Sequence, residues 1–458
     1  MNKFYITTAI DYANDVIHIG HAYQKILADC LARYHRLIGD DTKFLTGTDE
    51  HGQKVQKSAE AKEIDPKIFV DDITAKDKAE WKALNLSYDR FIRTTDTDHI
   101  EFCQKFYKKC QGNGDIYLGK YDGLYCEGCE AYYDETDLVD GQCQFHPTKK
   151  IQNLSAENYF FRLSKYQDFL LEHITKRPEF VWPEKHRNEV ISFIKSGLKD
   201  FSISRQKSQL SWGIPVPDDE NHVLYVWFDA LINYLTYGAE ENCWPADVHV
   251  LGKDNQRFHA IYWPAMLKSA GYELPKTILV HDFMALNGQK ISKSLGNVIR
   301  PTELVDKFGA DGVRYFFLRY GPLTNDIDIS IEKIKETYNA DLANGLGNLV
   351  ARIAKLGEKV SYESKKYKQE LFINLDDFRV DLALEKIWIK IKELDGETDQ
   401  DQPWKLEDEN LRKFLDKVVP EIQNLAFNLT PFVPETAEKI LKQFSGQIKS
   451  APPLFPRI

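Results

Sequence analysis

The sequence predicts an α/β fold with a parallel sheet, followed by an all-α region, from three observations. Residues 3–8 are aromatic and β-branched, as in a strand, and apolar residues then recur at helical spacing until Gly39. Strand-like and helical segments keep alternating up to residue 281, which is typical of parallel sheets. From residue 331 onward the apolar pattern is helical.

The same patterns give the remaining elements in chain order. Apolar segments ended by turn residues predict strands, and longer segments with apolar residues three or four apart predict helices. The run at 222–230 is mostly apolar, which indicates a strand buried on both faces of a parallel sheet. The expected elements are strands at 41–52, 90–96, 222–230, 248–254 and 276–281, helical segments within 55–111, and a helix starting at Phe258.

Two histidines lie where the first strand gives way to the first helix. His18 and His21 flank Gly20 at this junction, and ligands of open α/β sheets bind at such places. A helix N-terminus attracts phosphate, and imidazoles can donate hydrogen bonds to phosphate oxygens. Gly20 would let a flat ring approach the backbone closely. The alternative is two histidines that only complete the hydrogen bonds of a helix start.

A second segment, at 287–297, carries Lys290 and Lys293 among small polar residues and glycines. Two lysines three residues apart in such a setting suit a loop that closes on a polyphosphate. The alternative is an ordinary solvated loop. The two segments together point to nucleotide chemistry.

These two segments carry a resemblance to a known family. Residues 18–21 match the HIGH motif of class I aminoacyl-tRNA synthetases, and residues 290–294 match their KMSKS motif, with Ile291 in place of Met. The rest of the chain resembles the methionine-specific members. The resemblance implies ATP-dependent ligation of L-methionine to tRNA(Met) through a methionyl-adenylate, with release of AMP and pyrophosphate. Mg²⁺ would accompany ATP.

The resemblance also implies a domain order. An insert of about a hundred residues is too short for the editing domain of the leucine, isoleucine and valine enzymes, which argues against those three. The expected parts are the two halves of a Rossmann-type catalytic domain (1–112 and 213–275), a connective insert (113–212) with a zinc knuckle (126–146), a lysine-loop and stem-contact region (276–330), and a helical anticodon-binding domain (331–458).

Site residues follow from the family motifs. ATP-binding residues would be His18, Gly20, His21, Gly252, Asp254, Lys290 and Lys293, of which the two histidines and two lysines are the catalytic residues. Methionine-binding residues would be Ala9, Ile10, Tyr12, Asp49, Trp227, Ala230, Tyr234 and His259, with Asp49 on the amino group. Aromatic walls suit a thioether. From pattern alone, the aromatic residues could equally be ordinary core.

Four residues have the spacing of zinc ligands. Cys126 and Cys129 form one C-x-x-C pair, and Cys143 and His146 form a C-x-x-H pair. Two such tight turns supply the four ligands of a closed tetrahedral site, so the predicted zinc is structural. The alternative is a pair of exposed turns with reactive thiols.

The helical region offers candidate anticodon contacts. Asn344, Asn348 and Arg352 are four residues apart and share a helix face, and Trp404 follows later. Asn and Arg can read base edges, and Trp can stack on an unpaired base. In the resembling family the matching residues read the CAU anticodon. An ordinary helix face and a packed Trp are the alternative.

Charge and composition restrict the other possibilities. The net charge is −10, and the 20 basic and 22 acidic residues after position 330 do not favour a nonspecific nucleic-acid binder. No apolar run reaches the length of a membrane span, no signal segment precedes the first strand, and the seven cysteines suit a reducing compartment, so we expect a cytoplasmic protein. Because no appended tRNA-binding module follows, we expect a monomer.

Three positions depart from the family pattern. Asp11 is expected to add a charge near the substrate, Ile17 replaces a frequent proline, and Asn255 alters the pocket wall. Three other functions remain as alternatives: another class I synthetase or nucleotidyl transferase, a noncatalytic paralogue that binds tRNA or senses nucleotide, and a zinc-dependent nucleic-acid-binding protein. The intact histidine and lysine motifs argue against the second.

Overall fold

The computed structural model describes residues 2–458 except 127–130, 134–137, 145–148, 292–295 and 366. Its centre is a seven-stranded sheet in the order β2-β3-β1-β13-β14-β8, with β4 beside β3, and every pairing is parallel. The strands are β1 (Lys3–Thr8), β2 (Asp11–Tyr12), β3 (Asp41–Asp49), β4 (Arg90–Arg93), β8 (Val181–Trp182), β13 (Val248–Gly252) and β14 (Thr277–His281).

The order of these strands creates a crevice. From β1 the chain crosses to β3 on one side, and it later returns through β13 on the other side. The carboxyl ends of β1 and β13 therefore adjoin at the point where the strand order reverses, which is where open α/β sheets bind ligands. Thr8 pairs with Val250 at this point, and Ala9 N–H continues the ladder to the Val250 carbonyl at 3.0 Å.

Helices cover both faces of the sheet because successive strand residues point to opposite faces. Ile6 and Val250 pack with the helices of one face, α1 (Ile19–Ile38), α3 (Pro66–Ala83) and α9 (Pro301–Tyr320). Tyr5 and Leu251 pack on the other face with α4 (Thr97–Gly112), α7 (Val226–Glu240) and α8 (Trp263–Ala270), which follows the π-helical turn η5 (Phe258–Tyr262). Helix α2 (Gln53–Glu60) packs with α3 in a third, smaller apolar cluster.

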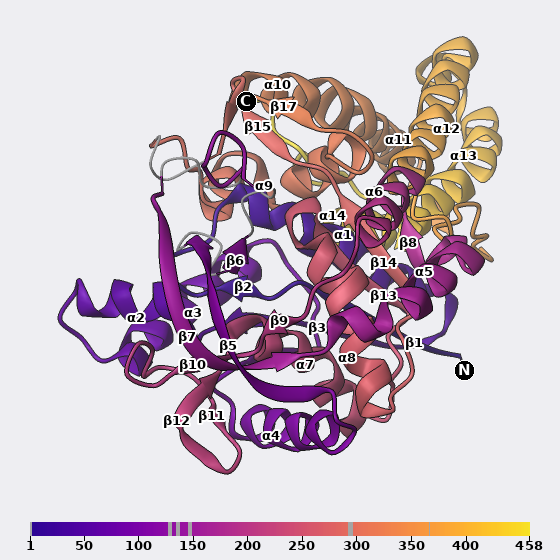
Figure 1. Cartoon of the computed structure of the whole chain (residues 1–458). Helices are drawn as coiled ribbons and strands as arrows, with labels where there is room; N and C mark the ends of the chain where they lie inside the picture. Colours follow the sequence, from indigo (N-terminus) through magenta and orange to yellow (C-terminus); the bar gives the residue numbers. More distant parts are fainter. Residues whose placement is uncertain (1, 127–130, 134–137, 145–148, 292–295, 366) are drawn as a thin grey trace.

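The insert forms an antiparallel sheet that Figure 1 shows as long strands beside the main sheet. Its order is β6-β5-β7-β9, and β5 and β7 pair over eleven residues each. The elements are β5 (Ile116–Cys126), β6 (Ala131–Tyr133), β7 (Ile151–Phe161), η2 (Leu163–Tyr166), α5 (Gln167–Lys176), η3 (Pro178–Phe180), α6 (Glu184–Lys195) and β9 (Phe201–Ser202).

The predicted parallel strand at 222–230 is wrong. Residues 219–224 form β12, which pairs antiparallel with β10 (Ser204–Gln206) and β11 (Pro215–Val216), and residues 226–230 begin helix α7. A short apolar run does not distinguish a buried strand from a buried helix, and α7 is buried almost all round. The other predicted strands have counterparts in β3, β4, β13 and β14.

Helices dominate the chain after residue 331, and α12 and α13 lie side by side at the upper right of Figure 1. The elements are α10 (Ile331–Thr337), the π-helical η7 (Tyr338–Gly347), α11 (Asn348–Lys359), β18 (Glu363–Ser364), α12 (Val380–Asp401), η8 (Pro403–Lys405), α13 (Asp408–Leu429), α14 (Pro434–Gln443) and β19 (Gly446–Gln447). Their apolar faces continue the core that covers α1 and α9. Among the described residues, no helix is both long and apolar enough to cross a membrane.

One buried ion pair joins these parts. The guanidinium of Arg314 on α9 lies 2.6 Å from the Asp29 carboxylate on α1, and both side chains are fully buried. Arg314 also donates to the carbonyls of Phe432 and Pro431 at 2.9 and 3.1 Å. Although burial alone would raise the pKa of Asp29, Arg314 and Arg33 hold it below its ordinary value.

We expect Arg314→Met to destabilise the chain by about 3 kcal/mol or more, because a buried carboxylate and two carbonyls lose their main partner. Urea unfolding measures the change. Arg33→Met is the matched control: Arg33 contacts the same carboxylate from a partly exposed position, so we expect a loss of about 1 kcal/mol or less. Equal losses in the two variants would contradict the prediction.

Candidate active site

The two histidines of the first helix are oriented by the backbone that they cap. His18 is the N-cap of α1, and its Nδ1 accepts from Gly20 N–H at 3.1 Å. His21 Nδ1 accepts from His18 N–H at 3.2 Å, and the two rings lie 4.1 Å apart. Because Nδ1 is the acceptor in both rings, the proton of each neutral imidazole is on Nε2. Each ring is thus set to donate from Nε2, as phosphate binding requires.

Gly20 is required by the ring of His18. A Cβ at this position would lie 2.8 Å from His18 Cε1 and 2.9 Å from His18 Nδ1, closer than real Cβ contacts. Any larger residue would displace the imidazole from its capping bond. The sequence predicted a glycine that admits a flat ligand ring, and the structure adds this packing reason inside the protein.

The chain just after the lysine segment bonds to the start of the helix that carries the histidines. Lys290 is in β16 (Gln289–Lys290), which pairs with β15 (Met284–Leu286), and β15 also pairs with β17 (Ile327–Ile329). Asn297 Nδ2 donates to the Lys290 carbonyl at 3.0 Å. The backbone N–H of Ile19, between the two histidines, donates to the Ile299 carbonyl at 2.9 Å. Both ends of the segment are therefore anchored, one of them at the start of α1; Lys293 lies outside the described residues.

Asp254 and Gly252 lie at the end of β13, beside the same crevice. Asp254 is exposed, and it belongs to the short helix η4 (Lys253–Asn255). Desolvation by the surrounding protein raises its pKa, while the ammonium groups of Lys290 and Lys253 lower it. Lys290 is thus within electrostatic reach of Asp254. A Cβ on Gly252 would lie 2.8 Å from Asp254 Oδ1, so the glycine leaves room for this carboxylate.

The predicted amino-acid pocket contains a buried hydrogen-bond chain. Tyr234 on α7 places its hydroxyl 2.7 Å from His259 Nε2, and His259 Nδ1 lies 2.9 Å from the Asn255 carbonyl. A carbonyl only accepts, so Nδ1 carries the proton and Nε2 accepts from Tyr234. Burial lowers the pKa of His259 to about 4, which keeps the ring neutral. The backbone of Asn255 therefore takes part in the site, whatever its side chain.

The other predicted methionine contacts lie on neighbouring elements. Trp227 is half-buried at the start of α7 and stacks on Phe258 with ring centroids 3.7 Å apart. Asp49, at the end of β3, is buried and pairs with Tyr12 of β2 in the sheet register. Ala9 and Ala230 are also buried, and Ile10 is half-buried. The fold thus brings residues from before position 50 and from after position 226 to neighbouring elements.

Glu50 was missed by sequence reasoning, although it fixes the turn that carries Asp49. Its fully buried carboxylate accepts from Arg93 at 2.6 and 2.9 Å and from Thr95 at 2.6 Å. Thr48 and Thr74 add two more bonds, at 2.7 and 2.8 Å. The feature of the sequence that could have indicated this role is a glutamate directly after a buried strand.

His51, the next residue, was also missed. Its Nδ1 lies 3.0 Å from the carboxylate of Asp229 on α7, and its ring packs on Trp212. Burial raises the pKa of Asp229, against the attraction of His51. This pair joins the turn after β3 to the helix that carries Trp227 and Ala230. The feature of the sequence that could have indicated this pair is Asp229, an aspartate within an apolar run.

The expectation that Asp11 adds a charge near the substrate needs correction. Lys25 Nζ lies 3.1 Å from Asp11 Oδ2, and both side chains are buried. Burial raises the pKa of Asp11 and lowers that of Lys25, so each charge depends on the other. As an ion pair, Asp11 and Lys25 are neutral overall, so Asp11 adds no net charge.

The predicted zinc ligands fall only partly within the described residues. Cys126 ends β5 and Cys143 follows it in the insert, and both are buried. Cys129 and His146 lie outside the described residues, so the geometry of the four-ligand set is not part of the structure. Thiols are a donor type that structural zinc sites use, and Cys126 and Cys143 are two buried thiols of the insert.

The predicted anticodon residues lie together on the helical region. Asn344 and Asn348 are exposed, and the Arg352 guanidinium lies 5.5 Å from the Trp404 ring centroid. Trp404 is 47% exposed, unlike a packed core residue. Arg352 is held at 2.8 Å by Asp395 and at 2.5 Å by Asp399, so base reading would have to compete with these carboxylates.

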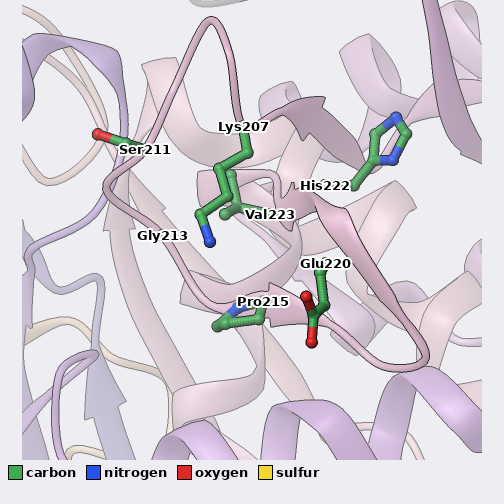
Figure 2. Close-up of a pocket in the computed structure, with 7 residues that line it drawn as sticks. All are labelled: Lys207, Ser211, Gly213, Pro215, Glu220, His222 and Val223. Atoms are coloured by element: carbon green, nitrogen blue, oxygen red, sulfur yellow. The ribbon is translucent and has the colours of Figure 1, made fainter.

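A surface cavity of about 400 Å³ shares no residue with any of these sites (Figure 2). In Figure 2 the Lys207 side chain extends toward Gly213, the Glu220 carboxylate lies on the side of Pro215, and the His222 ring points away. His222 instead contacts Asp219 at 2.8 Å and the Glu157 carbonyl at 3.0 Å. The lining residues are Lys207, Ser211, Gly213, Pro215, Glu220, His222 and Val223.

The class of protein follows from a family comparison. A family model described as tRNA synthetases class I (M) matches residues 4–152 and 133–354, which is more than half of the chain. The fold and site described above are therefore those of a class I tRNA synthetase.

The particular branch follows from individual relatives. The chain is 44% identical to a methionine--tRNA ligase of Clostridium acetobutylicum, over 97% of this chain and 74% of the relative. It is 43% identical to that of Caldanaerobacter subterraneus, over 96% and 73%. A Mycobacterium tuberculosis methionyl-tRNA synthetase in complex with methionyl-adenylate matches with a TM-score of 0.90 and 38% identity, over 99% of both chains. The chain belongs to the methionine--tRNA ligase family.

We expect the His259 ring to stay neutral, with its proton on Nδ1, from pH 8 down to about pH 5. Its folded pKa of about 4 lies below the unfolded value, so its contribution to stability is complete above about pH 6.5 and is lost as the pH falls toward 4. Nitrogen chemical shifts of the ring measure both properties. Protonation with a midpoint above about pH 6 would contradict the prediction.

Proposed function

We propose that this chain activates L-methionine with ATP and ligates it to tRNA(Met) through a methionyl-adenylate. The observation that supports this most directly is the common crevice of the two motifs. His18 and His21 begin α1, Ile19 bonds to the exit of the lysine segment at 2.9 Å, and Lys290 acts electrostatically on Asp254. These contacts support a triphosphate site at the reversal point of the sheet.

The first step needs no side-chain nucleophile. A carboxylate oxygen of methionine attacks the α-phosphorus of ATP, the bond from that phosphorus to the bridging oxygen breaks, and pyrophosphate leaves with the bonding electrons. Mg²⁺ accompanies ATP. His18 and His21 donate from Nε2, and Lys290 and Lys293 supply positive charge as negative charge builds on the phosphate oxygens.

The second step transfers the amino acid. A ribose hydroxyl of the terminal adenosine of tRNA attacks the carbonyl carbon of the adenylate, and AMP leaves. In the pocket, the neutral Tyr234–His259 pair offers no charge, which suits an uncharged thioether, and Trp227 presents an aromatic face. Asp49 supplies a carboxylate for the substrate ammonium group.

We propose that the helical region binds the anticodon through Asn344, Asn348, Arg352 and Trp404. The half-exposed indole beside a guanidinium supports this, since both groups stack on unpaired bases. A cytoplasmic location and a monomeric state remain predictions.

Methionine-dependent ATP–pyrophosphate exchange by the purified chain tests the activity. We expect exchange with methionine and little with the other amino acids. Exchange with a different amino acid would indicate another class I synthetase, and no exchange with any of them would indicate a noncatalytic paralogue.

We expect Lys293→Ala to leave methionine binding nearly intact and to slow exchange by about a hundredfold or more, because one charge that stabilises the transition state is lost. Lys449→Ala removes an exposed lysine outside the predicted sites and serves as the matched control. Exchange by Lys293→Ala at the rate of this control would reject the assigned role.

We also propose one structural Zn²⁺ held by Cys126, Cys129, Cys143 and His146. The first and third ligands are buried, as ligands of a closed site are. When bound, the ion would cross-link two turns of the insert.

We expect one zinc per chain by elemental analysis, and much less in Cys143→Ser, because a hydroxyl is a poor zinc ligand. Cys243→Ser is the control, since Cys243 is a buried cysteine outside the insert. Equal zinc in both variants, or none in the unaltered chain, would contradict the proposed site.

A further inference from the structure

A lysine is completely buried on the helix that carries the two histidines. Lys25 has no exposed surface, and it lies four residues after His21, on the same side of α1. Its neighbours on this helix, Ala22 and Ile26, belong to the apolar core. Burying an ammonium is costly unless every donor finds a partner.

Two groups accept hydrogen bonds from this ammonium, a nearby carboxylate forms an ion pair with it, and all three lie within four residues of one another. Lys25 Nζ is 2.5 Å from the Ala9 carbonyl, 3.0 Å from Thr8 Oγ1 and 3.1 Å from Asp11 Oδ2. Two of the three ammonium donors are therefore bonded to the segment, and the Asp11 carboxylate neutralises the charge from close by. Gln24 adds a longer bond to the same Ala9 carbonyl, at 3.4 Å.

The segment bound in this way is the link between β1 and β2. It carries Ala9, Ile10 and Tyr12, three of the residues assigned to methionine binding. The link has few other constraints from the sheet, because β2 contains only two residues. Its other described anchors include Ala9 N–H to the Val250 carbonyl and the pairing of Asp11 and Tyr12 with β3.

We propose that Lys25 is a positioning residue for methionine, and that Asp11 is the counter-ion that lets it be buried. The ammonium fixes the link that lines the amino-acid pocket to the helix that holds His18 and His21. One side chain thus sets the distance between the substrate carboxylate and the phosphate that it attacks. This inference rests on the proposed function and assigns to two residues a role that the family motifs did not.

Stability alone does not explain the pair. Well-packed apolar residues of similar volume usually replace a buried ion pair without loss of stability, and sometimes with a gain. An apolar pair would fill the space but would leave the Ala9 carbonyl and the Thr8 hydroxyl without the ammonium. What the charge adds is therefore orientation of the link. The difference in methionine binding between the charged pair and an apolar pair can be measured.

The test compares two variants in methionine-dependent ATP–pyrophosphate exchange and in thermal unfolding. In Lys25→Met we expect the KM for methionine to rise by roughly tenfold or more and the KM for ATP to change by less than about threefold, with a lowered Tm. In Asp11→Leu/Lys25→Met, which buries no charge, we expect the Tm to recover while the KM for methionine stays high.

The second variant keeps the test valid if Lys25→Met does not fold. Arg314→Met is the matched control, since it breaks another fully buried ion pair and should lower the Tm without raising the KM for methionine. An unchanged KM in the double variant would overturn the proposal and leave the pair a structural one. Exchange by the unaltered chain tests the proposed function separately, because it does not depend on this pair.

Discussion

The parallel pairing of β1 with β13 is the interaction on which the rest of the structure depends. It joins strands that are 242 residues apart in the chain, and the buried Thr7 hydroxyl reinforces it with a 2.6 Å bond to His249 Nδ1. His249 Nε2 accepts from Trp263, so the ring is a neutral link within the core. Without this pairing, the histidines of α1 and the carboxylate of Asp254 would belong to separate surfaces.

Two kinds of polar group surround the crevice that this pairing creates. Asp254 and Lys290, which we propose to face the nucleotide, keep exposed surface, and the ammonium of Lys290 partly offsets the desolvation that raises the pKa of Asp254. Glu50 and Lys25 instead hold the frame, since both are buried and each bonds to several neighbouring residues. The buried residues keep the exposed ones in place, since loops at strand ends have little apolar packing of their own.

Much of the fold was predictable because periodicity is local. Strands β1, β3, β13 and β14 and the start of α1 follow from patterns within a few residues, and the histidine and lysine motifs located the crevice. The run at 222–230 was misassigned because its apolar character fits a strand and a buried helix equally. The partners of Lys25, Glu50 and Arg314 could not be found from sequence, since spacing along the chain does not reveal which distant carboxylate or carbonyl a buried charge will meet.

The guanidinium of Arg314 also bears on how the chain unfolds. It binds a carboxylate of the nucleotide-binding half and two carbonyls close to α14, inside one uninterrupted apolar core. A fragment cut after α9 would expose that core and would leave Arg314 paired with Asp29 but without its two carbonyl partners. We therefore expect heating to melt the region before α10 and the helical region after it together, rather than one after the other.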